Sequence, residues 1–306
     1  MEIFDLKTMQ KIDIEEKTIV ALGTFDGCHY AHQRVLGEAF YMAKAKGVKS
    51  LVYTFYESPK TSFGTSLGSV FTFEEKIKAF QKTGIDYLAV DSFFDVKEMS
   101  ANDFFQNVLI DKLNAVGATC GYNYKFGKQR MGDGQLLSTL FSEKVGGSVK
   151  ICDKIEINNQ VVSSTLLRSL VQNGEVEQLY NLGTRYSIYS MVESGKKLGR
   201  TIGFPTINQK IPQDKVIPRK GVYITECEIG EDVYPAISNV GVRPSVESSC
   251  EINVETHIIG YDGMLYGSYV RVNFYKFLRE EQRFNNLDEL KVQISCDTEE
   301  AKKYFK

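Results

Sequence analysis

Two histidines behind a glycine-bounded turn are the first residues in the chain whose type and spacing suggest chemistry. They belong to the segment Gly23-Thr-Phe-Asp-Gly-Cys-His-Tyr-Ala-His32, where His29 and His32 stand three residues apart. In the first turn of a helix this spacing places both imidazoles on one side, where they could meet one phosphate group. Exposed loop histidines are one alternative. A zinc site is another, although no further Cys or His cluster would complete its tetrahedral shell.

A second stretch, Gly195-Lys-Lys-Leu-Gly-Arg-Thr-Ile-Gly-Phe-Pro-Thr-Ile-Asn208, combines three glycines with two lysines and an arginine. Free backbone N–H groups and positive charge in such a loop predict anion binding, although the pattern is not a Walker A motif. An ordinary basic hairpin is the alternative. Further along the chain, Glu255 and His257 alternate with apolar residues, so we expect both on one face of a strand.

Two more polar segments lie beside predicted elements. Gly121-Tyr-Asn-Tyr-Lys-Phe-Gly127 follows a predicted strand, at the edge where open parallel sheets bind ligands, with an ordinary turn as the alternative. Ser163-Ser-Thr-Leu-Leu-Arg168 is predicted to begin a helix, because paired serines suit an N-cap. Its arginine could bind triphosphate charge through a bidentate guanidinium.

The elements that must position these motifs alternate between strand and helix in the first part of the chain. The apolar run 19–22 ends at Gly23 and is typical of the first strand of a parallel sheet. Strands are also predicted at 49–55, 87–90 and 115–120, and helices at 33–46, 72–82 and 103–113. This alternation predicts a Rossmann-like α/β domain.

Gly183 marks the predicted domain boundary, because helix-like sequence gives way there to short alternating segments. Strands are predicted at 186–192, 222–227, 233–238, 252–258 and 268–275, and a helix at 287–295. Turn residues punctuate these strands at intervals that indicate a small antiparallel β-barrel. We therefore expect an α/β domain over 1–183 and a β-barrel domain with a C-terminal helix over 184–306.

Composition excludes some classes of function. The chain has 306 residues, a formal net charge of -2 and a pI near 6.1, which give no electrostatic reason to expect nucleic acid or an anionic membrane. Its apolar runs are short and its N-terminus lacks signal-peptide features, so we expect a cytoplasmic protein. Six dispersed cysteines predict reduced thiols. Cys28 lies near a predicted helix start, where a thiolate would be favoured.

Taken together, the motifs resemble those of the bacterial bifunctional riboflavin kinase/FAD synthetase family over nearly the whole chain. Gly-Thr-Phe-Asp-Gly-x-His-x-x-His resembles its nucleotidyltransferase motif, and Gly-Arg-x-x-Gly-Phe-Pro-Thr-x-Asn resembles its riboflavin kinase signature. The chain departs from the usual family pattern at Ala31, where glycine is usual, and at Glu57-Ser58, where Pro-His is usual. The resemblance implies ATP-dependent phosphorylation of riboflavin in the barrel, and transfer of AMP from ATP to FMN, with release of pyrophosphate, in the α/β domain.

The same resemblance implies a role for each site residue. Glu255 would be the catalytic base of the kinase, while Thr206 and Asn208 would bind Mg²⁺, or another divalent cation, with the ATP phosphates. His29, His32 and Arg168 would position and stabilise the phosphates during adenylyl transfer. The residues implied in nucleotide or flavin binding are Gly23, Phe25, Asp26, Gly27, Asn123, Phe126, Gly127, Ser163, Ser164, Thr165, Gly195, Lys196, Gly199, Arg200, Gly203 and Arg279.

The implied partners are the small molecules riboflavin, FMN and ATP, with no nucleic acid and no membrane. The sequence leaves the oligomeric state open, a homo-oligomer included. Two other functions remain as alternatives. Ala31 and Glu57-Ser58 motivate a riboflavin kinase whose adenylyltransferase domain is weakened or lost. The other alternative is a flavin-nucleotide-binding regulator without turnover, which the intact Thr206, Asn208 and Glu255 disfavour.

Overall fold

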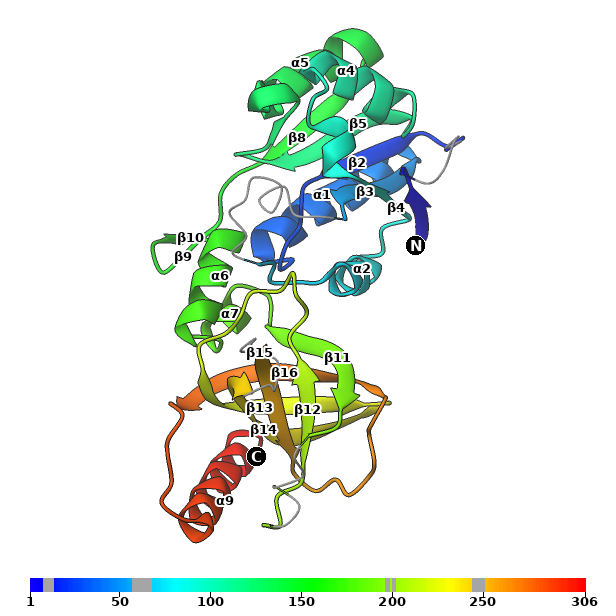
Figure 1. Ribbon diagram of the computed structural model, residues 1–306. Coiled ribbons are helices and arrows are strands. Elements are labelled where there is room, and N and C mark those ends of the chain that lie inside the picture. The colour runs from blue at the N-terminus through cyan, green and yellow to red at the C-terminus, as the bar shows by residue number, and fades with distance from the viewer. Residues whose placement is uncertain (8–13, 57–67, 196–198, 200–201, 244–250) are drawn as a thin grey trace. The chain divides into compact units, whose positions relative to one another are not determined.

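The computed structural model describes the chain except for residues 8–13, 57–67, 196–198, 200–201 and 244–250 (Figure 1). The described residues form two compact units, Met1–Leu166 and Leu167–Lys306. The first is an α/β unit and the second is built around a β-barrel, which confirms the predicted fold class.

A six-stranded parallel sheet forms the centre of the first unit, in the order β1-β4-β3-β2-β5-β8. Its strands are β1 (Glu2–Asp5), β2 (Thr18–Leu22), β3 (Lys49–Phe55), β4 (Tyr87–Asp91), β5 (Ala115–Gly121) and β8 (Ser148–Cys152). From β2 the chain adds β3 and β4 on one side and β5 on the other. The strand order therefore reverses between β2 and β5, and ligands of such sheets bind at the carboxyl ends of the strands at this point.

Helices cover both faces of this sheet. The residues of β2 point alternately to the two faces, and each face carries its own apolar cluster. On one face Ile19 and Ala21 pack with helices α1 (Tyr30–Lys46) and α2 (Phe73–Gln81). On the other, Val20 and Leu22 pack with the π-helix η2 (Phe104–Ile110) and α5 (Gly134–Val145). The short elements are α3 (Phe93–Val96), α4 (Ala101–Asp103), β6 (Lys125–Phe126), η3 (Lys128–Arg130), β7 (Gly132–Asp133), β9 (Glu156–Ile157) and β10 (Gln160–Val161).

The sequence missed some elements of this unit. It did not predict β1, β8 or α5, and the helix expected over 103–113 is a short α4 followed by the π-helix η2. The N-terminal strand β1 pairs in parallel with β4 and forms one edge of the sheet. Helix α2, which was predicted, begins with a capping box: Thr72 Oγ1 accepts from Glu75 N, and Glu75 Oε2 accepts from Thr72 N.

The second unit contains a closed barrel in the order β11-β12-β15-β14-β13-β16 (Figure 1). The strands are β11 (Ser187–Glu193), β12 (Thr206–Lys210), β13 (Gly221–Ile229), β14 (Asp232–Arg243), β15 (Glu251–Ile258) and β16 (Tyr269–Arg279). The predicted strands are all present, and β12 was not predicted as a strand. Helix α9 (Leu287–Tyr304) packs through Ala301 against Ile224 and Ile237 of the barrel, and it extends nine residues beyond the predicted end at 295.

Helices α6 (Ser164–Asn173) and α7 (Gln178–Asn181) precede the barrel, and Gly174, with a φ of 84°, lies between them. The break between the compact units falls after Leu166, whereas the domain boundary was predicted at Gly183. That boundary stays a prediction. Among the described residues no helix is long and apolar enough to cross a membrane. The five described cysteines, 28, 120, 152, 227 and 296, are free.

Candidate active sites

The two histidines of the first turn lie at the start of α1, directly after the carboxyl end of β2. His29 is the N-cap residue, and its Nδ1 accepts a 3.4 Å hydrogen bond from His32 N. The two rings stack with centroids 3.7 Å apart and an angle of 18° between their planes. The expectation that both imidazoles lie on one side is confirmed, although His29 caps the helix instead of lying in its first turn.

Burial keeps both rings neutral. It lowers the pKa of His29 to about 4, and it lowers the pKa of His32 well below its usual value, with a further contribution from His29. His29 Nε2 and His32 Nδ1 are buried and have no hydrogen-bond partner among the described residues. A site with two such unpaired ring nitrogens at a helix N-terminus is suited to a phosphate, which would offer oxygens to the rings and favour their protonation.

Phe25 explains why glycine is needed at position 23. Phe25 has a φ of 51° and its buried ring lies over Gly23, where an added Cβ would be 3.0 Å from the ring. The ring also meets His32 edge to face, with centroids 5.4 Å apart. Asp26 Oδ1 accepts from the backbone N–H groups of residues 70 and 71, at 2.8 and 3.0 Å. These residues shape the turn, and their ligand contacts stay predictions.

The serine pair at 163–164 contacts the turn that precedes His29. Ser164 Oγ donates a 2.9 Å hydrogen bond to the carbonyl oxygen of Asp26, across 138 positions of sequence. Ser163 Oγ accepts from Leu166 N and so caps α6, as its position predicted. Arg168 is buried in α6 and belongs to the second compact unit. Its role in adenylyl transfer stays a prediction, as does that of the exposed Thr165.

The loop after β5 holds one exposed and one buried candidate. Asn123 is exposed at the carboxyl end of the strand, next to the switch point of the sheet. Phe126 is part of the apolar core, and its ring stacks at 5.8 Å on Tyr124. Gly127 has a φ of 71°, and an added Cβ would lie 2.8 Å from the backbone of Ala101. Phe126 and Gly127 therefore hold the loop in place, while Asn123 remains the candidate for ligand contact.

Cys28 does not behave as the sequence suggested. Although it lies just before α1, burial raises the pKa of its thiol to about 12. The expectation of a favoured thiolate was wrong, because removing the anion from water outweighs the nearby helix N-terminus.

Strand pairing assembles the candidate kinase residues. In the antiparallel register of β12 and β15, Thr206 lies opposite His257 and Asn208 lies opposite Glu255. Directly opposed residues share a face of the sheet, so all four side chains lie on one side. The prediction that Glu255 and His257 share a face is confirmed. Glu255 is exposed, and His257 Nδ1 forms a 2.8 Å hydrogen bond with the carbonyl oxygen of Pro205.

Two cavities lie beside Thr206. The helix-side cavity, about 280 Å³, is lined by α9 and has the polar residues Asn239, Glu255, His257, Arg279, Glu281 and Asp297 in its wall. The loop-side cavity, about 370 Å³, is lined mainly by residues 205–207 and 261–266. Thr206 lines both cavities. Asn208, its neighbour on the same face, lines neither cavity.

The oxygens of Thr206 and Asn208 fit a magnesium ion bound together with phosphates. Asn208 is 4% exposed, and its Oδ1 is buried with no hydrogen-bond partner among the described residues. Gly195 packs against its amide so closely that any Cβ there would overlap it. In the part of the chain that the structure describes, no three His, Cys, Asp or Glu residues cluster as metal ligands.

The glycine loop is only partly within the described residues. A Cβ at Gly199 would overlap the carbonyl oxygen of Phe204, and Phe204 N in turn donates to Gly199 O at 2.8 Å, so this glycine closes a tight turn. Gly203 has a φ of 85° and open space around it. Lys196 and Arg200 lie outside the described residues.

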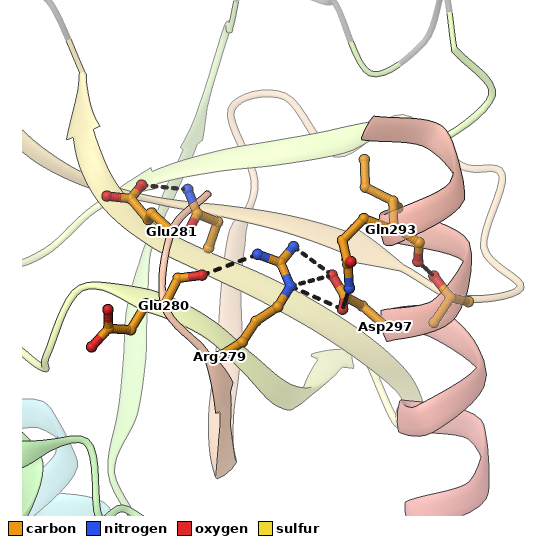
Figure 2. A network of polar contacts seen from close by, with 8 residues as sticks. Arg279, Glu280, Glu281, Gln293 and Asp297 are labelled. Atoms are coloured by element: carbon orange, nitrogen blue, oxygen red, sulfur yellow. Dashed lines mark hydrogen bonds and ion pairs between the residues drawn. The ribbon is translucent and has the colours of Figure 1, made fainter. Parts of the chain in front are cut away.

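Arg279 is held by helix α9 (Figure 2). Its Nε and Nη2 donate to the carboxylate of Asp297, with the shortest contact, Nη2 to Oδ2, at 2.7 Å. Sequence reasoning missed Asp297 and also Glu281, whose Oε1 accepts a 3.1 Å hydrogen bond from Asn239 Nδ2. The sequence offered no local signal for either residue, because the predicted strand ended at 275 and Glu281 lies beyond the end of β16.

The α/β unit and the barrel unit each carry a candidate site with polar groups that suit phosphates. Such a pair of sites indicates a transferase that acts on phosphate compounds. The comparisons identify which one. Residues 11–166 match the FAD synthetase family model and residues 182–305 match the riboflavin kinase family model. The chain belongs to the bifunctional riboflavin kinase/FMN adenylyltransferase family. It phosphorylates riboflavin to FMN with ATP and then adenylylates FMN to FAD, releasing pyrophosphate.

Relatives from several bacteria agree over the full length. Bifunctional riboflavin kinase/FMN adenylyltransferases from Bacillus subtilis, Haemophilus influenzae and Escherichia coli are 32%, 31% and 30% identical. The matches cover 95%, 94% and 95% of this chain and 93%, 94% and 94% of those proteins. A solved structure described as a macrolide-efflux protein from Streptococcus pneumoniae has a TM-score of 0.87 at 27% identity and covers 99% of both chains. That likeness extends to both units of the fold.

Proposed function

We propose that the kinase reaction takes place where the two cavities meet, with riboflavin in the helix-side cavity and ATP in the loop-side cavity. The register of β12 and β15 is the observation that carries this proposal, because it places Thr206, Asn208 and Glu255 on one face. Glu255 would accept the proton of the riboflavin 5′-hydroxyl as that oxygen attacks the γ-phosphate. It is free to do so, since it has no hydrogen bond or ion pair to any described residue.

Thr206 and Asn208 would hold Mg²⁺, which would neutralise charge on the ATP phosphates. His257 has a positioning role in this scheme. Its Nδ1 must carry the proton in order to donate to the Pro205 carbonyl oxygen, and burial lowers its pKa, so the ring stays neutral. The ring thereby ties β15 to the peptide immediately before Thr206.

In the α/β unit, the stacked histidines would position the phosphates of ATP during AMP transfer to FMN. Neither ring needs to act as a base, because the nucleophile is a phosphate of FMN that is already ionised. Asn123 lies at the same edge of the sheet and would contact the nucleotide or the transferred phosphate. Ser164, whose hydroxyl binds the Asp26 carbonyl, supports the turn.

We also propose that the protein works in the cytoplasm on small molecules, without nucleic acid or membrane partners. The near-neutral charge balance and the five free cysteines support this location and set of partners.

Exchange of Glu255 tests the kinase assignment. Glu255→Gln keeps the shape of the side chain and removes its basicity, so kcat for FMN formation should fall about 10²–10⁴-fold while the KM for riboflavin changes little. Formation of FAD from supplied FMN should continue at the parental rate. A loss below threefold, with chemistry shown to be rate-limiting, would reduce Glu255 to an orienting residue.

His32→Ala provides the reciprocal experiment. It should leave FMN formation unchanged and slow the conversion of FMN to FAD by at least about tenfold, because one phosphate contact is lost. Both products can be followed by chromatography of one reaction mixture. A His32→Ala protein that makes FAD from FMN at the parental rate would show that the nucleotide binds elsewhere. Ala31→Gly should speed the FAD step if the extra methyl group crowds the phosphate.

A further inference from the structure

A buried ion pair fixes one wall of the helix-side cavity to the barrel. Arg279 ends strand β16 and Asp297 lies in the middle of α9, with the Asp297 side chain only 4% exposed. Two N–H groups of the guanidinium, on Nε and Nη2, point at the two carboxylate oxygens (Figure 2). This paired geometry fixes both the position and the plane of the guanidinium.

Asp297 has no capacity left for a substrate. Oδ1 accepts from Arg279 Nε at 3.1 Å and from Gln293 Nε2 at 2.9 Å, while Oδ2 accepts from Arg279 at 3.2 and 2.7 Å. Gln293 precedes Asp297 by one helical turn, so α9 itself orients the carboxylate (Figure 2). Any influence of Asp297 on a ligand must therefore act through Arg279.

Arg279 does have donors to spare. A guanidinium carries five N–H groups. Three of them are used by Asp297 and by the carbonyl oxygen of Glu280, to which Nη1 donates at 3.1 Å. One N–H on each terminal nitrogen has no partner among the described residues, and Arg279 lines the cavity. The fixed guanidinium thus has two donors left for a ligand.

The surrounding charge favours a neutral ligand at this place. Asp297 balances the charge of Arg279, and the carboxylates of Glu255 and Glu281 line the same cavity. Without free positive charge, this wall would attract a phosphate poorly. The two spare N–H donors suit uncharged acceptors better, such as the carbonyl oxygens of the flavin ring of riboflavin.

We propose that Asp297, supported by Gln293, is a positioning residue for riboflavin binding: it holds Arg279 so that its two spare N–H donors meet acceptors of the flavin. The inference rests on the proposed placement of riboflavin in the helix-side cavity. An arginine fixed before the ligand arrives loses less conformational freedom on binding, so riboflavin affinity depends on a residue that does not touch it.

Steady-state kinetics of FMN formation by the full-length protein test this role. Asp297→Asn should raise the KM for riboflavin about tenfold or more, with kcat and the KM for ATP within threefold of the parent. Gln293→Leu, which leaves the ion pair in place, should raise the riboflavin KM about two- to fivefold. Glu280→Gln is the matched control: its side chain pairs with Arg219 at the surface, and only its backbone meets Arg279, so all constants should stay unchanged.

The Arg279→Met variant distinguishes the positioning role of Asp297 from the placement of riboflavin in the helix-side cavity. Arg279→Met should raise the riboflavin KM, and Asp297→Asn should add nothing further in that background. An unchanged riboflavin KM in Arg279→Met would show that riboflavin does not occupy this cavity. The positioning role alone would be overturned if Arg279→Met raised the riboflavin KM while Asp297→Asn and Gln293→Leu both kept the parental KM. Thermal destabilisation of Asp297→Asn would then show that the ion pair is only structural. If Asp297→Asn does not fold, Gln293→Leu decides.

Discussion

At the scale of single residues, the neutral state of His29 links the nucleotide turn to pH. Its pKa falls from the ordinary 6.5 to about 4 on folding, so the folded state favours the neutral ring. The stability that this provides is complete above pH 6.5 and is lost as the pH falls from 6.5 towards 4. The shift corresponds to about 3 kcal/mol of unfolding free energy across that window.

His29→Asn offers a matched comparison, because asparagine is also a good N-cap and does not titrate in this range. Urea unfolding of the α/β unit can be measured between pH 7 and pH 4. The free energy of unfolding should fall over this range in both proteins, and the fall should be smaller in the variant by up to about 3 kcal/mol. Carboxylate titration is common to both proteins and cancels in the difference. Parallel curves for the two proteins would show that His29 titrates normally in the folded state.

At the scale of elements, the start of β13 and the end of β16 meet at Gly221. Gly221 has a φ of 142°, and an added Cβ would lie 2.5 Å from the carbonyl oxygen of Arg279. Gly221→Ala should therefore lower the free energy of unfolding of the barrel unit by about 2–4 kcal/mol. It should also raise the KM for riboflavin, because Arg279 would be displaced.

Gly230 is the control for this substitution. It lies in the turn between β13 and β14 with a φ of 64° and has no heavy atom within 4 Å of an added Cβ. Gly230→Ala should cost about 1 kcal/mol from backbone strain alone, with the KM for riboflavin unchanged. Thermal unfolding and FMN kinetics measure both effects. If the free energy of unfolding fell equally in the two variants, the contact between position 221 and Arg279 would not contribute to the effect of Gly221→Ala.

At the scale of the whole molecule, the two compact units suggest that the kinase can be isolated, and the position of the cut matters. Helix α6 belongs with the barrel unit: Arg219 N donates to Val171 O at 3.2 Å, and an added Cβ at Gly174 would lie 3.2 Å from the ring of Phe277. A fragment of residues 163–306 should fold and make FMN but not FAD. A fragment of residues 184–306 should be less stable by at least about 2 kcal/mol, because it lacks α6 and α7 and their buried leucines.

Circular dichroism melting and FMN assays of the two fragments decide where the domain boundary lies. If residues 184–306 are as stable and as active as the longer fragment, the boundary is at Gly183, as the sequence predicted. A folded 163–306 fragment without kinase activity would show that the kinase site needs residues of the α/β unit.

Much of this protein could be predicted from local sequence signals. The apolar run of β2, the helix that begins at Thr72 and the serine N-cap of α6 are determined by neighbouring residues, so the sequence by itself predicts them. The motif resemblance likewise predicted both activities, which the comparisons confirm. The π-helix, β1, β8 and β12 were missed because their backbone is set by sheet partners and packing distant in sequence.

Only the tertiary structure decided how the site residues are used. Burial, which no local pattern reports, lowers the pKa of both histidines and raises that of the Cys28 thiol. The pairing of Asp297 with Arg279 across 18 positions depends on where α9 docks on the barrel. Sequence spacing shows which side chains can share a face of one element, whereas solvation and contacts between elements follow from the packing of the whole chain.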